Sequence, residues 1–276
     1  MGESYGRRRF LGLGAGILMA AGARPAWQAG AASTGQDLPE RLRGVRALTF
    51  DVFGTVVDWR SSIAREGREM AARKGLDGDW NAFAERWRAG YGPAMSRVRQ
   101  GELPWTKIDD LHRMILDELI PEFGLESLSE AERVELNYAW HRLSPWPDAV
   151  EGLTRLRARY VLATLSNGNV ALLVNMAKAA GLPWDAVLSA ELARAYKPDA
   201  IVYRTAADLL GLAPEQVMMV AAHAGDLRAS AAVGFRTAYV PRPQEYGPDS
   251  GRDLTPDPAF DVVATDFVDL AAQLGL

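Results

Sequence analysis

Short apolar runs separated by longer, helix-like stretches make up most of the chain. Six runs predict β-strands, at residues 45–50, 160–165, 186–189, 217–221, 237–240 and 262–264. Between them, apolar residues recur at the three- and four-residue spacing of helices, and two such stretches end at Gly181 and Gly211, where glycine favours the end of a helix. This alternation predicts an α/β protein with a Rossmann-like parallel sheet and helices on both faces.

The stretch between the first two predicted strands breaks the alternation. It contains no strand signal, and its apolar residues recur only at helical spacing. The three sets are Phe83, Trp87, Tyr91, Met95 and Val98; Ile108, Leu111, Ile115 and Leu119; and Leu136, Ala139, Trp140 and Leu143. We therefore predict a helical cap over residues 59–147, inserted into a core of residues 44–58 and 148–276. Such a cap would exclude water from the sheet end and carry substrate-binding residues.

The N-terminus has the pattern of an export signal. Arg7 and Arg8, followed by Arg9 and the apolar pair Phe10 and Leu11, precede an apolar stretch rich in glycine and alanine, and residues 29–31 read as a small-residue cleavage site. The stretch is too short to span a bilayer comfortably. Residues 1–35 are predicted to be a twin-arginine (Tat-type) signal peptide and linker, so the Tat export machinery is an expected transient partner and the expected location is periplasmic or exported. A basic N-terminus without this role and an uncleaved anchor are the alternatives.

Composition and charge narrow the functional classes. Of the 276 residues, 48% are hydrophobic, enough for a sizeable core, and there is no cysteine to form a disulfide, a thiolate nucleophile or a metal site. The net charge of −4 includes +3 from residues 1–31, which leaves an acidic body. An acidic body argues against a nucleic-acid partner, but a local positive pocket could still bind a small anion.

Polar side chains gather where the predicted strands end, which is where parallel sheets place their active sites. Asp51 ends the first strand beside Gly54 and could be a nucleophile or a turn-capping residue. Ser166 and Asn167 end the second strand and could bind an anion or cap a helix. Both readings remain open when each signal is taken alone.

The later strands add a lysine and an aspartate. Lys197, after the third strand, could keep an aspartate nucleophile ionised or be a solvated surface lysine. Asp226, after the fourth, could orient Lys197 or help activate a water, or else cap a helix. His223 is ranked low as a base, because a hydrogen bond could account for an imidazole near that strand end.

Taken in order, these signals resemble the four motifs of the haloacid dehalogenase superfamily. The motifs are Asp51-Val52-Phe53-Gly54-Thr55, Leu165-Ser166-Asn167-Gly168, Lys197-Pro198-Asp199 and Gly225-Asp226. The resemblance spans residues 45–240 or so. It implies that the chain is a hydrolase with Asp51 as its nucleophile.

Two positions separate this chain from the Mg-dependent phosphatases of the superfamily. Those enzymes carry a second aspartate two residues after the nucleophile, where this chain has Phe53. They usually carry a further acidic residue four positions after the Gly-Asp pair, where this chain has Ser230. Mg²⁺ prefers hard oxygen ligands, so the reduced set predicts an enzyme without a metal or other cofactor.

The remaining details are similar to the (S)-2-haloacid dehalogenase branch. The first motif and the Lys197-to-Tyr203 segment match that branch, and Arg88 in the cap resembles the arginine that receives the departing halide. Some members carry Ser and Asn where this chain has Ala222 and His223. That departure concerns how the hydrolytic water is held.

The resemblance implies two displacements on a small 2-haloacid. Asp51 attacks the halogen-bearing carbon to give an aspartyl ester, and water then releases a 2-hydroxy acid. Arg88 and Asn167 would hold the halide, because arginine stays charged and has several fixed donors. Ser166, Asn167 and backbone groups near Thr55 would bind the substrate carboxylate. Lys197, Tyr203 and Asp226 would support the nucleophile and hydrolysis, and Trp59 and Trp87 could wall an apolar pocket.

Two other functions are weighed beside dehalogenation. One is a phosphatase of the same superfamily with an altered Mg site, and the other is a non-catalytic descendant that binds a small acid. The intact motif residues argue against the second alternative. A homodimer is an open expectation, since dimers are common among relatives.

Overall fold

The computed structural model describes residues 38–248 and 250–276. A six-stranded parallel sheet runs through the core in the order β5-β4-β1-β6-β7-β8. Its strands are β1 (Ala47–Phe50), β4 (Val161–Ser166), β5 (Ala186–Ser189), β6 (Val217–Ala221), β7 (Arg236–Tyr239) and β8 (Val262–Val263). The predicted α/β class is therefore confirmed, and each of the six predicted strands is present with its ends shifted by two residues or fewer.

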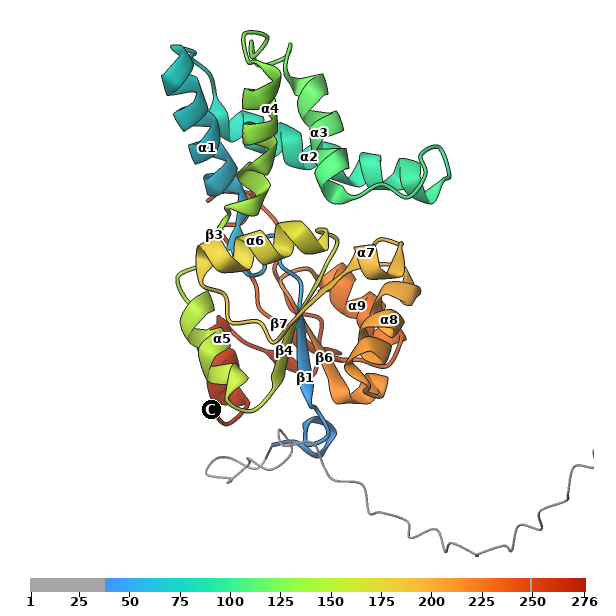
Figure 1. Ribbon diagram of the computed structural model, residues 1–276. Helices are drawn as coiled ribbons and strands as arrows, with labels where there is room; N and C mark the ends of the chain where they lie inside the picture. The colour runs from blue at the N-terminus through green and yellow to red at the C-terminus, as the bar shows by residue number, and fades with distance from the viewer. Residues whose placement is uncertain (1–37, 249) are drawn as a thin grey trace, which may run out of the picture. The chain divides into compact units, whose positions relative to one another are not determined.

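Helices cover both faces of this sheet (Figure 1). They are α5 (Ala149–Arg157), α6 (Val170–Ala180), α7 (Ala190–Ala193), α8 (Ala200–Leu210), α9 (Ala224–Ala232) and α10 (Phe267–Gln273), with 3-10 turns η2 (Glu40–Leu42) and η4 (Pro214–Gln216). Figure 1 shows α5 on one side of the sheet and α8 and α9 on the other. Helices α6 and α8 end at Gly181 and Gly211 in the left-handed conformation, as the glycine positions predicted.

The stretch between β1 and β4 holds the helices that were predicted to form a cap. They are α1 (Trp59–Lys74), α2 (Trp80–Arg99), α3 (Ile108–Leu119) and α4 (Glu130–Asn137), followed by the 3-10 turn η3 (Tyr138–His141). Local signals define their ends: the Asp58 side chain accepts a hydrogen bond from the Ser61 amide before α1, and Ser129 and Glu132 form a capping box on α4. Buried aromatic side chains such as Phe83, Trp87 and Trp140 fill the space between these helices.

Two sequence predictions for this stretch were wrong in detail. It does contain a strand, because β3 (Ser144–Pro145) pairs antiparallel with β2 (Val57–Asp58) where the chain enters and leaves the insertion. Two residues per strand are too few to produce an alternating pattern. The last predicted helical set is divided between α4 and η3, since the α-helix ends at Asn137. None of the described helices has the length and apolar character needed to cross a bilayer.

Polar contacts join the inserted helices to the core near the sheet end. Asp109 of α3 accepts a hydrogen bond from the side chain of Asn169, the residue that precedes α6, and lies 2.9 Å from the His141 ring. Arg99 of α2 donates to the backbone oxygen of Lys197 and forms an ion pair with Asp199. The cap thus contacts the two loops that carry the second and third motifs. The predicted export signal, residues 1–35, lies outside the described residues.

Candidate active site

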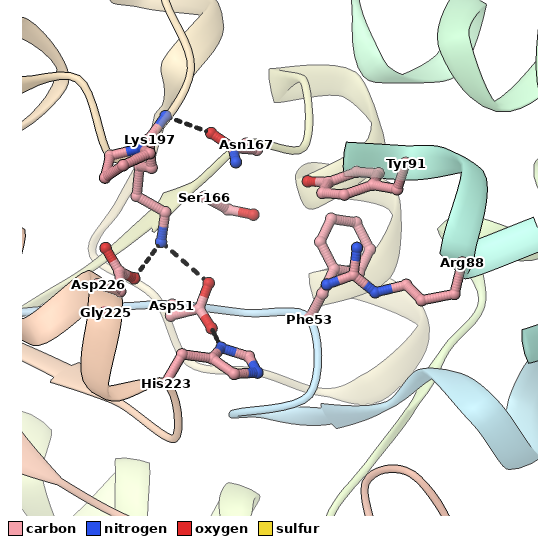
Figure 2. Close-up of a pocket in the computed structure, with 11 residues that line it drawn as sticks. Asp51, Phe53, Arg88, Tyr91, Ser166, Asn167, Lys197, His223, Gly225 and Asp226 are labelled. Atoms are coloured by element: carbon pink, nitrogen blue, oxygen red, sulfur yellow. Dashed lines mark hydrogen bonds and ion pairs between the residues drawn. The ribbon is translucent and has the colours of Figure 1, made fainter. Parts of the chain in front are cut away.

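The candidate site lies where β1 ends, at the point where the sheet order reverses. From β1 the chain crosses to β4 and β5 on one side and then to β6, β7 and β8 on the other, which leaves a crevice beyond the carboxyl ends of the strands. A cavity of about 320 Å³ occupies it (Figure 2). Its lining residues are Asp51, Phe53, Arg88, Tyr91, Ser166, Asn167, Lys197, Pro198, His223, Gly225 and Asp226.

Asp51 is held by hydrogen bonds to both carboxylate oxygens. Oδ1 accepts from the Lys197 ammonium at 2.9 Å. Oδ2 accepts from the Thr55 hydroxyl at 2.8 Å and lies 2.8 Å from Nδ1 of His223. Because Oδ2 already has two partners and Oδ1 has one, Oδ1 keeps a lone pair for attack on a substrate.

The charges around Asp51 keep it ionised. Burial alone would raise the pKa of this carboxyl, but the Lys197 ammonium and the His223 ring outweigh it, so the pKa of Asp51 lies far below its usual range. Burial also opposes a charged Lys197, but Asp226 and Asp51 outweigh it and raise the pKa of the ammonium above its ordinary value. At neutral pH the site therefore holds an ionised carboxylate paired with an ammonium ion.

Lys197 bridges the two aspartates of the site. Its Nζ lies 2.5 Å from Oδ2 of Asp226 as well as 2.9 Å from Asp51 (Figure 2). The Tyr203 hydroxyl donates to the other oxygen of Asp226 at 2.5 Å. The backbone N–H of Lys197 donates to the Asn167 side chain at 2.7 Å, which fixes the start of the lysine loop. Asp226 itself lies in the first turn of α9, five residues after the end of β6.

Arg88 of α2 brings an unpaired positive charge to the cavity. It forms no ion pair or hydrogen bond with any described residue, and its buried Nε has no partner. Its guanidinium lies over the rings of Tyr91 and Trp59, at 4.3 and 5.8 Å from their centroids. A half-buried cation among aromatic rings is poorly solvated, so the site favours a bound anion next to Arg88.

Neutral donors face the same cavity from the loop after β4. The Ser166 oxygen accepts the Gly168 amide, which leaves the hydroxyl hydrogen free to donate. The Asn167 oxygen accepts from the Lys197 amide, which leaves the NH₂ group of this cavity-lining side chain as a second donor. Phe53 and Tyr91 form an apolar wall (Figure 2). The cavity thus combines an ionised carboxylate, groups that can donate hydrogen bonds to an anion, and an apolar surface.

Comparison with known proteins places this geometry in a family. The model of haloacid dehalogenase-like hydrolases matches residues 45–234. An (S)-2-haloacid dehalogenase 4A of Burkholderia cepacia is 34% identical over 217 residues, covering 73% of this chain and 87% of that protein. The chain belongs to the haloacid dehalogenase-like hydrolases.

Solved structures agree with this membership. The crystal structure of a defluorinating L-2-haloacid dehalogenase aligns with a TM-score of 0.83 and 47% identity, over 87% of this chain and 99% of that one. The L-2-haloacid dehalogenase of Xanthobacter autotrophicus with chloropropionic acid covalently bound aligns with a TM-score of 0.69 and 25% identity, over 83% and 98%. The resemblance to the (S)-2-haloacid dehalogenase branch is therefore confirmed.

Three side chains of this haloacid dehalogenase-like hydrolase take positions that differ from the sequence interpretation. Thr55 was expected near the substrate carboxylate, but its fully buried hydroxyl donates to Asp51 and accepts from the Ala222 amide, so it positions Asp51. Tyr203, which was expected to support the nucleophile and hydrolysis, is also fully buried and donates to Asp226 without lining the cavity. Trp59 and Trp87 are buried and do not line the cavity. The aromatic wall is built by Phe53 and Tyr91.

Two residues were underestimated or missed by the sequence reasoning. His223, ranked low, contacts the nucleophile through Nδ1, and its Nε2 lies 3.0 Å from Oε2 of Glu245. Burial opposes a charged ring, but hydrogen bonds to Asp51 and Glu245 outweigh it and raise the pKa of His223 to about 10. Glu245 lies in the loop after β7, and no spacing in its neighbourhood points to chemistry. The only sequence signal was the glycine at position 54. In the structure its φ is 83°, and an added Cβ would lie 2.1 Å from Oε1 of Glu245.

A magnesium ion, as in the phosphatases of the superfamily, would need oxygen ligands from these side chains. A cation shared by Asp51 and Asp226 would need their free oxygens, but both carboxylates are already bridged by the Lys197 ammonium. Phe53 offers no ligand atom, and the buried Ser230 hydroxyl donates to the backbone oxygen of Leu227. Mg²⁺ needs several hard oxygen ligands in octahedral geometry, so the described donor set does not fit it.

Proposed function

We propose that this protein hydrolyses short 2-haloalkanoic acids to 2-hydroxy acids through an ester formed on Asp51. The observation that supports the proposal is that one small cavity holds two groups: Asp51, which is ionised and has a free Oδ1 lone pair, and Arg88, a cation with no counterion among the described residues. Phosphate transfer would need charge neutralisation and a general acid, which Phe53 cannot supply. Carbon–halogen cleavage needs neither, because a halide leaves without protonation.

The first step is a displacement at carbon. The Oδ1 lone pair forms a bond to C2 of the substrate while the carbon–halogen bond breaks and its electron pair leaves with the halide. Arg88 stabilises the departing halide, since its guanidinium is the unpaired cation on this cavity. The hydroxyl of Ser166 and the amide of Asn167 are donors for the substrate carboxylate. Phe53 and Tyr91 shield the reacting carbon from water.

The second step cleaves the ester at Cγ of Asp51. Water adds to Cγ and gives a proton to Asp226, which Tyr203 and Lys197 hold in place. When the tetrahedral intermediate collapses, the Cγ–Oδ1 bond breaks and Lys197 gives a proton to the departing product oxygen. The proton on Asp226 then returns to Lys197 across their 2.5 Å contact. The second proton of the water remains on the new Asp51 carboxyl and is released to solvent, which restores the carboxylate. The displacement in the first step inverts C2, and the second step does not involve C2. An (S)-2-halo acid therefore gives an (R)-2-hydroxy acid.

The test is halide release from (S)-2-chloropropionate by the protein lacking residues 1–31, with EDTA present. We expect chloride and (R)-lactate in equal amounts. In a single turnover in H₂¹⁸O with enzyme in excess, the lactate hydroxyl should be unlabelled, since it comes from Asp51. Failure to release chloride, together with Mg-dependent hydrolysis of a phosphate ester, would overturn the proposal. Fluoroacetate belongs among the substrates assayed, because one solved relative is described as defluorinating.

We further propose that residues 1–35 direct export by the twin-arginine route. The support is the order of features along the sequence: paired arginines, a short apolar stretch and a small-residue site. Replacing Arg7 and Arg8 with lysines should move the protein from the extracytoplasmic fraction to the cytoplasm, as measured by cell fractionation. An unchanged distribution would contradict the export signal.

A further inference from the structure

His223 lies between the carboxylates of Asp51 and Glu245. Its Nδ1 is 2.8 Å from Oδ2 of Asp51, and its Nε2 is 3.0 and 3.1 Å from the two oxygens of Glu245. Carboxylate oxygens only accept hydrogen bonds. The ring can satisfy both contacts only when both of its nitrogens carry hydrogen, so this geometry selects the imidazolium ion. That charge state is unsuited to a general base, which must accept a proton.

The two oxygens of Asp51 have different partners, and this sets what His223 can do. Oδ1, with its free lone pair, forms the ester bond in the proposed reaction. Oδ2 then becomes the ester carbonyl oxygen, still facing the His223 ring and the Thr55 hydroxyl, each 2.8 Å away in the free enzyme. When water adds to Cγ, the negative charge of the tetrahedral intermediate develops on this oxygen.

We propose that His223 is a catalytic residue of ester hydrolysis, acting as an imidazolium that stabilises the oxyanion on Asp51 Oδ2, with Glu245 as its positioning residue. The inference rests on the proposed function. Water adds to Cγ and the carbonyl electron pair moves to Oδ2, where His223 and Thr55 donate hydrogen bonds. The pair returns to reform the carbonyl as the Cγ–Oδ1 bond breaks. His223 keeps its proton throughout, and proton transfer remains with Asp226 and Lys197.

Glu245 is built into the fold as a partner for this ring. Its carboxylate is 3% exposed and also accepts a hydrogen bond from Nε1 of Trp59, at 3.1 Å. It packs directly against the backbone of Gly54, where an added Cβ would lie 2.1 Å from Oε1. A glycine in the first motif therefore makes room for the carboxylate that orients His223. The remaining space beside Glu245 is a second cavity of about 260 Å³ that His223 also lines.

Several charged groups surround the imidazole, and they determine how it titrates. On the substrate side these are Asp51, Lys197, Asp226 and Arg88, and on the other side they are Glu245, Arg242, Arg252 and Asp253. Esterification removes the charge of Asp51, which leaves Glu245 as the carboxylate in contact with the ring. Loss of the Glu245 charge should therefore lower the pH at which the imidazolium deprotonates in the ester intermediate.

The first experiment separates the two chemical steps in His223→Ala. Asp51 keeps Lys197 and Thr55 in this variant, so we expect the first turnover to release halide at close to the parent rate. Ester hydrolysis should slow by about 10²–10³-fold, as for the loss of an oxyanion donor. Rapid-quench measurement should then show a burst of one halide per enzyme. Intact mass spectrometry should show the substrate's carbon skeleton attached to Asp51.

The second experiment uses pH and the shape-conserving variant Glu245→Gln. An imidazolium donor predicts that ester hydrolysis declines as pH rises through the pKa of His223, and that Glu245→Gln moves this decline to lower pH. A general-base role for His223 predicts the opposite, with hydrolysis lost as pH falls. Glu215→Gln changes an exposed glutamate that precedes β6, at the opposite end of this strand from His223; it is the matched control and should leave the profile unchanged.

The outcomes distinguish the inference from the proposed function. If the parent releases no halide and forms no adduct, both are overturned. If the parent dehalogenates but His223→Ala slows both steps equally, without an adduct, His223 is only structural and the inference alone fails. A pH profile of hydrolysis that rises with deprotonation of His223, or one that Glu245→Gln leaves in place, also overturns it.

Discussion

Replacing Asp51 with asparagine should abolish halide release, with a loss on the order of 10⁴-fold or more for a residue that forms the covalent bond. The amide keeps the shape of the side chain but removes the negative charge that makes Oδ1 a nucleophile. It also leaves Lys197 paired with Asp226 alone, and His223 paired with Glu245 alone. Chloride release from (S)-2-chloropropionate, followed at enzyme concentrations high enough to detect one turnover, measures the effect.

An exposed aspartate supplies the control for this variant. Asp77→Asn makes the same chemical change on the surface, in the turn between α1 and α2, and should retain parent activity. Melting temperatures of both variants show whether the fold is kept. If Asp51→Asn were folded and still released chloride at the parent rate, the nucleophile would have to be another group, with Asp226 the first to examine.

Replacing Arg88 with methionine should reduce halide release by about 10²–10³-fold, as expected when a charged donor to a developing anion is lost. The methionine retains much of the packing against Tyr91 and Trp59, so the loss reports on the guanidinium charge. The effect should be larger for 2-chloropropionate than for 2-iodopropionate, because chloride concentrates the developing charge and leaves less readily. Steady-state kinetics on the two substrates measure this difference.

The neighbouring Arg86 is a matched control on the same helix. It is exposed and paired with Glu122, so Arg86→Met should leave both rates close to those of the parent. Equal losses for chloro and iodo substrates in Arg88→Met would contradict a role in halide departure. They would indicate that Arg88 binds the substrate carboxylate instead.

Much of the core was predictable because buried parallel strands leave a strong local signal. The runs at 186–189 and 217–221 coincide with β5 and β6, since strands covered on both faces are apolar throughout. The residues that follow β1 and β4 could be placed near one another because carboxyl ends of parallel strands share one edge. The β2–β3 pair was missed, because two residues per strand carry no periodicity.

The candidate site was also predictable only in part. Asp51, Asn167, Lys197 and Asp226 were identified because their order along the chain follows the order of the motifs. Their mutual distances were set by the sheet, which brings residues 146 and 29 positions apart within reach of one ammonium group. Whether Thr55 and Tyr203 face a ligand or support another side chain depends on directions that no spacing encodes.

The sequence by itself determined the fold class, the motif positions and the absence of a second aspartate at Phe53, because these depend on residue type and local periodicity. Only the tertiary structure decided that Arg88 has no counterion among residues 38–248 and 250–276, and that His223 bridges Asp51 and Glu245. Both facts depend on which side chains meet from distant segments. Glu245 lies nearly two hundred residues after Asp51 in the sequence, and the His223 ring connects the two carboxylates. They come together only because the loop that carries Glu245 packs against Gly54.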